Sequence, residues 1–535
     1  MPADLVLYNG HVITLASDGP AAEAVAIQDG RFMAVGDNTT VRALAGPHTK
    51  QIALDGATVI PGLCDSHNHL LNTGMGMSRV QLAAARSLAD VLQAVGERTA
   101  ETPPGQWIVA SGGWHESALR EQRLPTAREL DQVAPNHPVY IPRGGHVVVV
   151  NSHALRLAGI TKETVTPERG VIERDPEGGT LTGVLMERPA FELVERHLPR
   201  PTHEDRMAAI RRATKAYVAA GWTSVRDPGL HPVEMQAYQD LRARDELPLR
   251  VLMALRLEAR TQPVAEIVDM LRREEPRTGA GDELLRVGTT GITVDGGVET
   301  GYFRDPYATD PSYHGVLSIP EDTLESIIQL AHEHGWQVAA GVVGDAAMDV
   351  LLRVYERVNA QRSIVGRRFL MEYAFQPSPE SFARARQLGL VITMQHPLVY
   401  ALGANMVKYW GDARARRCSP VCDWLAHGLV VAGGTDSHVG PYQPLLAIWG
   451  TVTRHTKAAG VLGPEQRVSR EDALRAYTMN TAYMSFEEHL KGSIEPGKLA
   501  DLVVLSDDIL TCPEDEIKDL KVHMTVVGGR IVHEA

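Results

Sequence analysis

Two histidines, His67 and His69, stand two residues apart at the end of an apolar run that begins at Val59. On a β-strand, residues i and i+2 project from the same face, so both imidazoles can be directed at one cation. Near the other end of the chain, Asp436 lies in Gly-Gly-Thr-Asp-Ser-His, directly after another apolar run. This pattern predicts a divalent-metal site made by His67, His69 and Asp436, with His438 as a further ligand and Asp436 as a catalytic base.

Other side chains that could bind a metal or a substrate follow apolar segments elsewhere in the chain. Tyr373 is a second candidate for a catalytic role, with simple packing as the structural alternative. His115 and His146 follow apolar segments and are the candidates for substrate binding. The further candidate metal ligands are Asp295, Glu372, His396 and Glu187.

The middle of the chain alternates short apolar segments with segments of helical period, which predicts βα units and a parallel sheet. Eight such units favour an α/β fold of the TIM (β/α)8 type, in which sites lie at the carboxyl ends of the strands. The candidate ligands follow the predicted strands, as such a site requires. The predicted strands are Val59–Leu63, Thr223–Arg226, Arg250–Leu255, Gly291–Asp295, Gln337–Gly341, Arg368–Tyr373, Leu390–Gln395 and Leu429–Gly433.

Both ends of the chain are rich in short strands and turns. Asn9-Gly10 and Asp29-Gly30 each follow an apolar segment and predict tight hairpins. We therefore predict a composite β-sandwich domain formed by residues 1–58 and 487–535, with the barrel at 59–486. About 160 residues separate the first two barrel strands, far more than one βα connection needs, so we expect a large insertion after the first strand, at about 73–202.

The composition and net charge indicate which kinds of binding partner and which cellular compartment to expect. The 535 residues carry a net charge of −13, which argues against nucleic acid and anionic membranes as partners and leaves a small molecule as the expected substrate. The chain starts without a basic and apolar leader, and its four cysteines are too few for a disulfide framework. A cytoplasmic location is expected.

Several motifs resemble the amidohydrolase superfamily, in the branch called amidohydrolase family 3. They are Leu-Tyr-Asn-Gly-His-Val, Pro-Gly-Leu-Cys-Asp-Ser-His-Asn-His, Asn-Ser-His-Ala-Leu, Gly-Trp-Thr-Ser-Val-Arg-Asp, Val-Gly-Asp-Ala-Ala, Gly-Gly-Thr-Asp-Ser and Gly-Ser-Ile-Glu-Pro-Gly-Lys-Leu-Ala-Asp-Leu-Val-Val-Leu. The resemblance covers essentially the whole chain. It implies the barrel, the composite β-domain, a divalent-metal centre and a homodimer.

The resemblance also shows where the chain departs from the family. Members typically hold two metals, and His67, His69 and Asp436 match the ligands of the first. The usual bridging lysine and the two histidines of the second metal match Thr293, Gly341 and Tyr373, none of which can replace them. The set that remains is two histidines and one carboxylate, which is the ligand signature of non-haem Fe(II) oxygenases.

Three functions are compatible with this pattern. We favour a non-haem iron monooxygenase with one or two iron ions, similar to the amidohydrolase-fold diiron enzymes of platensimycin and platencin biosynthesis and acting on an apolar intermediate such as a diterpenoid thioester. The alternative is a hydrolase of C–N bonds in amides, formamides or cyclic amides, with Zn²⁺ or another divalent metal. The second alternative is an inactive scaffold with a residual metal.

Overall fold

The computed structural model describes residues 1–16, 22–143, 147–167, 170–175, 179–259, 262–273 and 277–535. The chain divides into two compact units, one made of residues 1–70 and 214–535 and the other of residues 71–213. His146 lies outside the described residues. None of the helices in the described ranges is both long enough and apolar enough to cross a membrane.

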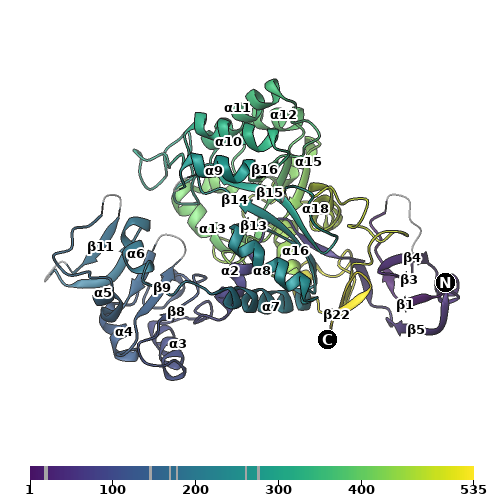
Figure 1. Cartoon of the computed structure of the whole chain (residues 1–535), viewed down its shortest axis with the longest axis horizontal. Helices are drawn as coiled ribbons and strands as arrows, with labels where there is room; N and C mark the ends of the chain where they lie inside the picture. The colour runs from purple at the N-terminus through teal and green to yellow at the C-terminus, as the bar shows by residue number, and fades with distance from the viewer. Residues whose placement is uncertain (17–21, 144–146, 168–169, 176–178, 260–261, 274–276) are drawn as a thin grey trace. The chain divides into compact units, whose positions relative to one another are not determined.

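An eight-stranded parallel sheet forms the centre of the first unit, and it confirms the predicted TIM-type barrel (Figure 1). Each strand pairs in parallel with the next along the chain, and a hydrogen bond of 3.0 Å from the Ser66 N–H to the Gly433 carbonyl links the ends of the first and last strands. In order, the strands are β7 (Leu63–Asp65), β13 (Trp222–Leu230), β14 (Arg250–Arg256), β15 (Leu285–Thr293), β16 (Gln337–Val342), β17 (Leu370–Tyr373), β18 (Val391–Met394) and β19 (Val430–Gly433).

Most of the helices around these strands are amphipathic, as expected for a layer that covers a barrel, whereas α16 (Pro444–Thr453) is buried almost throughout. In α11 (Asp345–Gln361) the side chains of Ala347, Leu351, Val354 and Val358 are buried, a spacing of three and four residues that places them on one face. The other helices of this layer are α8 (Pro232–Ala243), α9 (Val264–Arg272), α10 (Glu321–Glu333), α12 (Pro379–Gln387), α13 (His396–Trp410), α15 (Val421–Ala426), α17 (Arg470–Ala476) and α18 (Met479–Met484).

The predicted first barrel strand at 59–63 is wrong in its position. The apolar run is divided into β6 (Thr58–Pro61), which pairs with β20 (Leu502–Leu505) in another sheet, and β7, which belongs to the barrel. Gly62 lies between them, and a Cβ there would stand 2.3 Å from Oγ1 of Thr223. Only glycine therefore fits where the chain passes from one sheet into the other.

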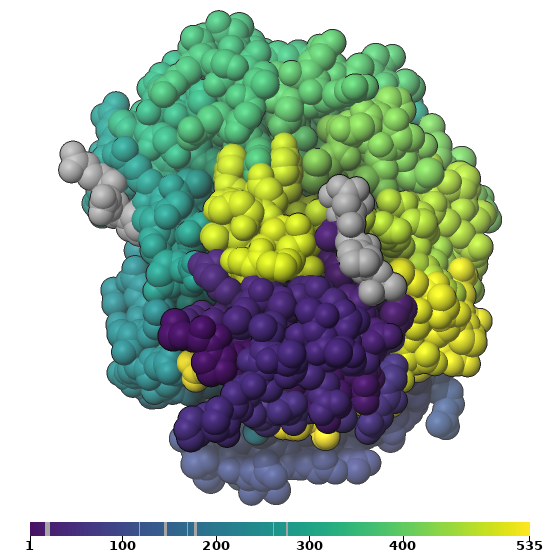
Figure 2. Space-filling view, turned by 90° about the vertical axis from the view of Figure 1, so that its right-hand side faces the viewer, coloured from purple at the N-terminus to yellow at the C-terminus, as the bar shows by residue number. Residues whose placement is uncertain are grey.

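Two further sheets belong to the same unit, the first made of N-terminal strands and the second of strands from both ends of the chain. One has the strand order β4-β3-β1-β5 and the other β2-β6-β20-β21-β22. Figure 2 shows N-terminal residues, in purple, against C-terminal residues, in yellow. The strands are β1 (Ala3–Tyr8), β2 (His11–Val12), β3 (Ala24–Gln28), β4 (Arg31–Gly36), β5 (Ala45–Ala53), β21 (Val522–Val527) and β22 (Arg530–Glu534).

One apolar cluster joins these two sheets, with Leu7 and Ile27 from the first and Val59, Leu502 and Val526 from the second. The Asp29-Gly30 hairpin is confirmed, because β3 and β4 pair antiparallel. The Asn9-Gly10 hairpin is wrong, because β2 pairs with β6 and not with β1. The turn there carries the chain between sheets.

The second unit, residues 71–213, covers the segment predicted as an insertion. It contains a five-stranded sheet with the order β11-β12-β10-β9-β8. The strands are β8 (Ile108–Val109), β9 (Val139–Arg143), β10 (Val147–Val150), β11 (Val171–Arg174) and β12 (Leu181–Met186), with helices α3 (Leu88–Glu101), α4 (Ala127–Val133), α5 (Ser152–Leu157) and α6 (Arg188–Glu195). Two apolar clusters, one containing Val149 and the other Val148, give this unit its own core on both faces of the sheet.

Candidate metal centre

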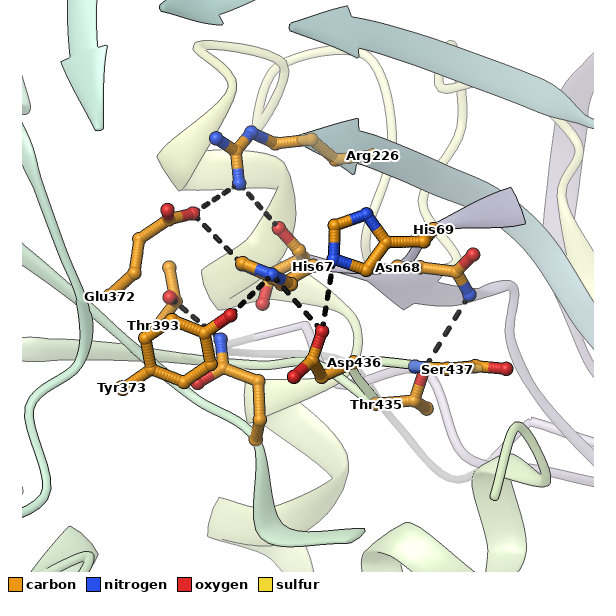
Figure 3. Close-up of polar contacts among 12 residues, drawn as sticks. His67, Asn68, His69, Arg226, Glu372, Tyr373, Thr393, Thr435, Asp436 and Ser437 are labelled. Carbon is orange, nitrogen blue, oxygen red and sulfur yellow. Dashed lines mark hydrogen bonds and ion pairs between the residues drawn. The ribbon is translucent and has the colours of Figure 1, made fainter. Parts of the chain in front are cut away.

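Three side chains converge where β7 and β19 end (Figure 3). Nε2 of His69 lies 3.2 Å from Oδ1 of Asp436, and Nε2 of His67 lies 3.4 Å from the same oxygen. The three atoms that could bind a cation lie within 4.8 Å of one another. The structure thus brings together the three residues predicted from the sequence as the principal ligands.

The backbone holds the two strand ends in this arrangement. The N–H groups of Thr435 and Asp436 donate to the carbonyl of His67, at 3.1 and 2.8 Å. A Cβ on Gly434 would stand 2.9 Å from the backbone nitrogen of His67, so glycine allows the two segments to approach. The buried Asp65 carboxylate accepts the N–H of His67 and both the N–H and the hydroxyl of Thr435, at 3.1, 3.0 and 2.6 Å. Sequence analysis missed Asp65, which ties the ligand-bearing segments to each other.

The charges at this point fit a cation. Oδ1 of Asp436 is buried and meets the two imidazole nitrogens, with no other donor in the described part of the chain. Burial opposes a charge on Asp436, but hydrogen bonds from His67 and His69 hold the pKa of its carboxyl below the usual range. Burial likewise opposes a charge on His67, but the nearby Glu372 and Asp436 raise the pKa of its imidazole to about 9. Two imidazoles and a carboxylate are ligands that a divalent transition metal accepts.

Glu372, a candidate ligand in the sequence, has a different place in the structure. Its Oε1 lies 3.0 Å from Nδ1 of His67 and 2.5 Å from a terminal nitrogen of Arg226. Burial opposes its charge, but Arg226 and His67 hold the pKa of Glu372 at about 2. The carboxylate is therefore engaged behind the His67 ring, on the side away from Asp436. It fixes Nδ1 and leaves Nε2 to face the ligand group.

Arg226 was not predicted as part of the site. Its side chain is 1% exposed and also donates to the carbonyl of Ser66 at 3.1 Å and to Oγ1 of Thr289 at 2.6 and 3.2 Å. These partners come from the middle of β15, from β17 and from the residue after β7, so the guanidinium crosses the barrel interior. A charged residue within an apolar strand was the signal that could have identified it.

Tyr373 lies on the other side of the His67 ring. Its hydroxyl oxygen is 3.1 Å from Nε2 of His67, and the two ring centroids are 5.1 Å apart. The backbone of Tyr373 is left-handed, with φ of 65°, as is that of Asp436, with φ of 51°. A Cβ on Gly341 would lie 3.1 Å from the Tyr373 ring, so glycine at 341 gives the ring its place.

Two further candidates are buried but lie outside the ligand group. Both oxygens of Asp295 accept backbone N–H groups, from Tyr302, Val343 and Gly344, all at 2.9 Å. These bonds give the carboxylate a structural role at the start of α11. His396 is 1% exposed, and neither of its ring nitrogens has a partner among the described residues. Neither residue joins the three-ligand group of the described chain.

The other predicted site residues are more peripheral. The exposed His438 has its ring centroid 5.9 Å from that of His69, but it is not one of the three convergent ligands. Within the second unit, His115 is half-buried with its Nδ1 3.5 Å from Glu116, and Glu187 directly precedes α6. Thr293, at the end of β15, is exposed.

Known proteins resemble the chain over nearly its full length. The family model described as "Amidohydrolase family" matches residues 50–533. Protein LONG AFTER FAR-RED 3 of Arabidopsis thaliana is 31% identical over 99% of this chain and 91% of its own, and N-substituted formamide deformylase of Arthrobacter pascens is 30% identical over 99% and 98%. The crystal structure of an uncharacterized metal-dependent hydrolase from Pyrococcus furiosus matches with a TM-score of 0.75 and 26% identity, over 95% of this chain and 100% of that one.

Proposed function

The chain belongs to the amidohydrolase family, and from this premise we propose that it is a divalent-metal-dependent hydrolase of C–N bonds in amides, formamides or cyclic amides. The observation that carries the proposal is the convergence of His67, His69 and Asp436 at the carboxyl end of the barrel. The relative named N-substituted formamide deformylase, aligned over 99% of this chain, supports this class of reaction.

Each residue of the centre has a part in the proposed reaction. His67, His69 and Asp436 would hold the ion, which supplies Lewis-acid polarisation of a carbonyl and activation of water. Glu372, supported by Arg226, orients the His67 ring. The oxygen of water bonds to the carbonyl carbon, the C–N bond breaks, and a proton passes to the nitrogen, which gives an acid and an amine. Asp436 is the group that accepts the proton from water and returns it.

A second candidate is the iron monooxygenase favoured on the sequence alone. Two histidines and one carboxylate are the ligand type of non-haem Fe(II) oxygenases, and this set is the observation that favours it. The names of the relatives given above offer no support for an oxygenase, for iron or for antibiotic biosynthesis. We therefore rank the hydrolase, with Zn²⁺ as the proposed ion, above the monooxygenase that the sequence alone favoured.

One experiment separates the candidates. The protein is loaded with Zn²⁺, Co²⁺, Mn²⁺ or Fe²⁺ and incubated with N-substituted formamides, simple amides and cyclic amides, with and without O₂, while release of the amine is measured. The hydrolase predicts amine release without O₂ that is lost in His67→Ala and Asp436→Ala. O₂ uptake that depends on Fe²⁺, with no amine released, would favour the monooxygenase. A metal-binding protein with neither activity would favour the scaffold.

The remaining expectations complete the proposal. We propose a small-molecule substrate, a homodimer and a cytoplasmic location. Light scattering of the purified full chain tests the homodimer, since a single species with the mass of one chain would contradict it.

A further inference from the structure

The hydroxyl of Tyr373 is placed among the atoms of the ligand group. It lies 3.1 Å from Nε2 of His67, the nitrogen that also lies 3.4 Å from Oδ1 of Asp436. Figure 3 shows the hydroxyl and the Asp436 carboxylate approaching this nitrogen from the same side of the site. Nδ1, on the other side of the ring, is held by Glu372 at 3.0 Å.

The backbone around Tyr373 is adapted to this position. Tyr373 has φ of 65° and the next residue, Ala374, has φ of 44°, whereas a bulky residue rarely adopts positive φ. The Ala374 N–H still donates to the Val342 carbonyl at 3.0 Å, so β16 and β17 remain joined at this point. Such left-handed residues cost free energy, and they collect at functional sites.

The space for the ring depends on glycine. A Cβ on Gly341 would lie 3.1 Å from Cε2 and 3.3 Å from Cδ2 of Tyr373, closer than ordinary contact. On its outer side the ring packs with Phe375, at 5.9 Å between centroids, in an apolar cluster. The ring is therefore fixed between β16 and this cluster, and the hydroxyl keeps its position beside His67.

We propose that Tyr373 is a catalytic residue whose hydroxyl donates a hydrogen bond to the carbonyl oxygen of the amide substrate. This inference depends on the proposed hydrolase function. When Nε2 of His67 binds an ion, it can no longer hydrogen-bond to Tyr373, and the hydroxyl turns to another acceptor beside the ion. In amide hydrolysis the carbonyl oxygen gains negative charge, and a fixed donor at that atom stabilises the charge.

Of the described side chains beside Nε2 of His67, Tyr373 is the one that can donate a hydrogen bond to a substrate oxygen. Of the two side chains in the described part of the chain that contact Nε2 of His67, Asp436 is a carboxylate, which accepts hydrogen bonds. Tyr373 carries an O–H group, which can donate a hydrogen bond. This hydroxyl can donate to an oxygen while the ligands hold the ion.

The test replaces the hydroxyl and follows ligand binding without turnover. The full chain is loaded with Co²⁺, whose visible absorption reports its surroundings, and is titrated with acetohydroxamate, which presents a carbonyl oxygen to a metal ion. In Tyr373→Phe we expect the Kd of acetohydroxamate to rise about tenfold, the loss of one neutral hydrogen bond. The Co²⁺ content and its Kd stay as in the parent protein. Tyr409→Phe, which removes a hydroxyl from the same apolar cluster, is the matched control and keeps the parent Kd for acetohydroxamate.

Two outcomes would overturn the inference while the proposed function stands. Unchanged acetohydroxamate binding in Tyr373→Phe would mean that the hydroxyl does not reach the ligand, and loss of Co²⁺ would mean that Tyr373 is a metal ligand. A parent protein that binds neither Co²⁺ nor acetohydroxamate would instead contradict the hydrolase and the inference with it. With an identified substrate, kcat falls about 100-fold in Tyr373→Phe if the donor acts on the transition state.

Discussion

Replacing Glu372 by glutamine tests how the barrel interior controls the metal centre. The carboxylate joins His67 at 3.0 Å to Arg226 at 2.5 Å, and the side chains of Glu372 and Arg226 are 5% and 1% exposed. Glutamine keeps the size of the side chain but removes its charge. Both contacts are made by one oxygen, Oε1, so a glutamine oxygen in its place can still accept from His67 and Arg226, but the negative charge that supports both partners is lost.

The expected effects on stability and on metal affinity differ in size. A buried Arg226 without its carboxylate partner should lower the unfolding free energy by about 3–5 kcal/mol. The loss will be smaller if the hydrogen bonds of Arg226 to Ser66 and Thr289 stabilise the unpaired charge. Loss of the carboxylate that supports a metal-binding histidine typically weakens metal affinity by about 10- to 100-fold. That range corresponds to about 1.4–2.7 kcal/mol.

The assay combines urea unfolding of the metal-free protein with competition for Zn²⁺ against a chelator of known affinity. The control is the double variant Arg226→Met/Glu372→Leu, which removes both charges and should recover most of the lost stability without recovering Zn²⁺ affinity. Parent-like Zn²⁺ affinity in Glu372→Gln would refute the argument that the charge of Glu372 supports His67 as a metal ligand. A decrease in Zn²⁺ affinity of far more than 100-fold, in a variant as stable as the parent protein, would show that Glu372 is itself a ligand.

Further predictions concern the ion, the glycine beside Tyr373, and two buried polar groups. Zinc analysis of the full chain should give one ion per chain, and a chelator should lower the unfolding free energy by about 2.7 kcal/mol relative to protein at 100 times the Kd; two ions per chain would contradict the three-ligand site. Gly341→Val should cost about 1–3 kcal/mol in urea unfolding because it overpacks against Tyr373, and an unaffected midpoint would mean that the ring can move away. Arg250→Met should cost about 3–5 kcal/mol, since it leaves Asp501 buried without its two-pronged partner at 2.7 and 2.8 Å; Arg250→Met/Asp501→Leu should restore much of the loss. Asn151→Ala should cost about 1–3 kcal/mol in thermal unfolding, because this buried amide caps α5 and also bonds β9 of the second unit, while Asn151→Asp should cost at least as much, because it keeps the cap but sets a buried carboxylate against the carbonyls of Ala134 and His137.

The barrel could be predicted from the sequence because each strand is a local apolar segment followed by a segment of helical period. Seven of the eight predicted strands overlap the observed barrel strands in their apolar cores, from Thr223–Arg226 to Leu429–Gly433. The first strand could not be placed, because Val59–Leu63 is apolar throughout and both of its halves are buried. The strand of the barrel and the strand of the other sheet are told apart by their partners, β13 and β20, which lie far along the chain.

The proximity of the three candidate ligands could also be predicted from the sequence. His67 and His69 are related by local strand geometry, and Asp436 by the rule that barrel sites gather at the carboxyl ends of strands. The role of Glu372 could not be predicted from the sequence, because a carboxylate at the end of a strand can either bind a metal or hold a metal-binding side chain in place. Its contact with Arg226, 146 residues away in the chain, decides between these roles.

A count of buried charge explains why this site favours an added positive charge. Behind the His67 ring, the charges of Arg226 and Glu372 cancel. In front of it, Asp436 is 7% exposed, and with both imidazoles neutral its charge has no counterpart. A buried carboxylate without compensation is costly, so a positive charge must enter the group. The pKa of the His67 imidazole is raised to about 9, because a proton on this ring supplies the positive charge that Asp436 lacks. A divalent ion satisfies it with one positive charge in excess, and that excess is available to the oxygen of a substrate carbonyl as it becomes negative.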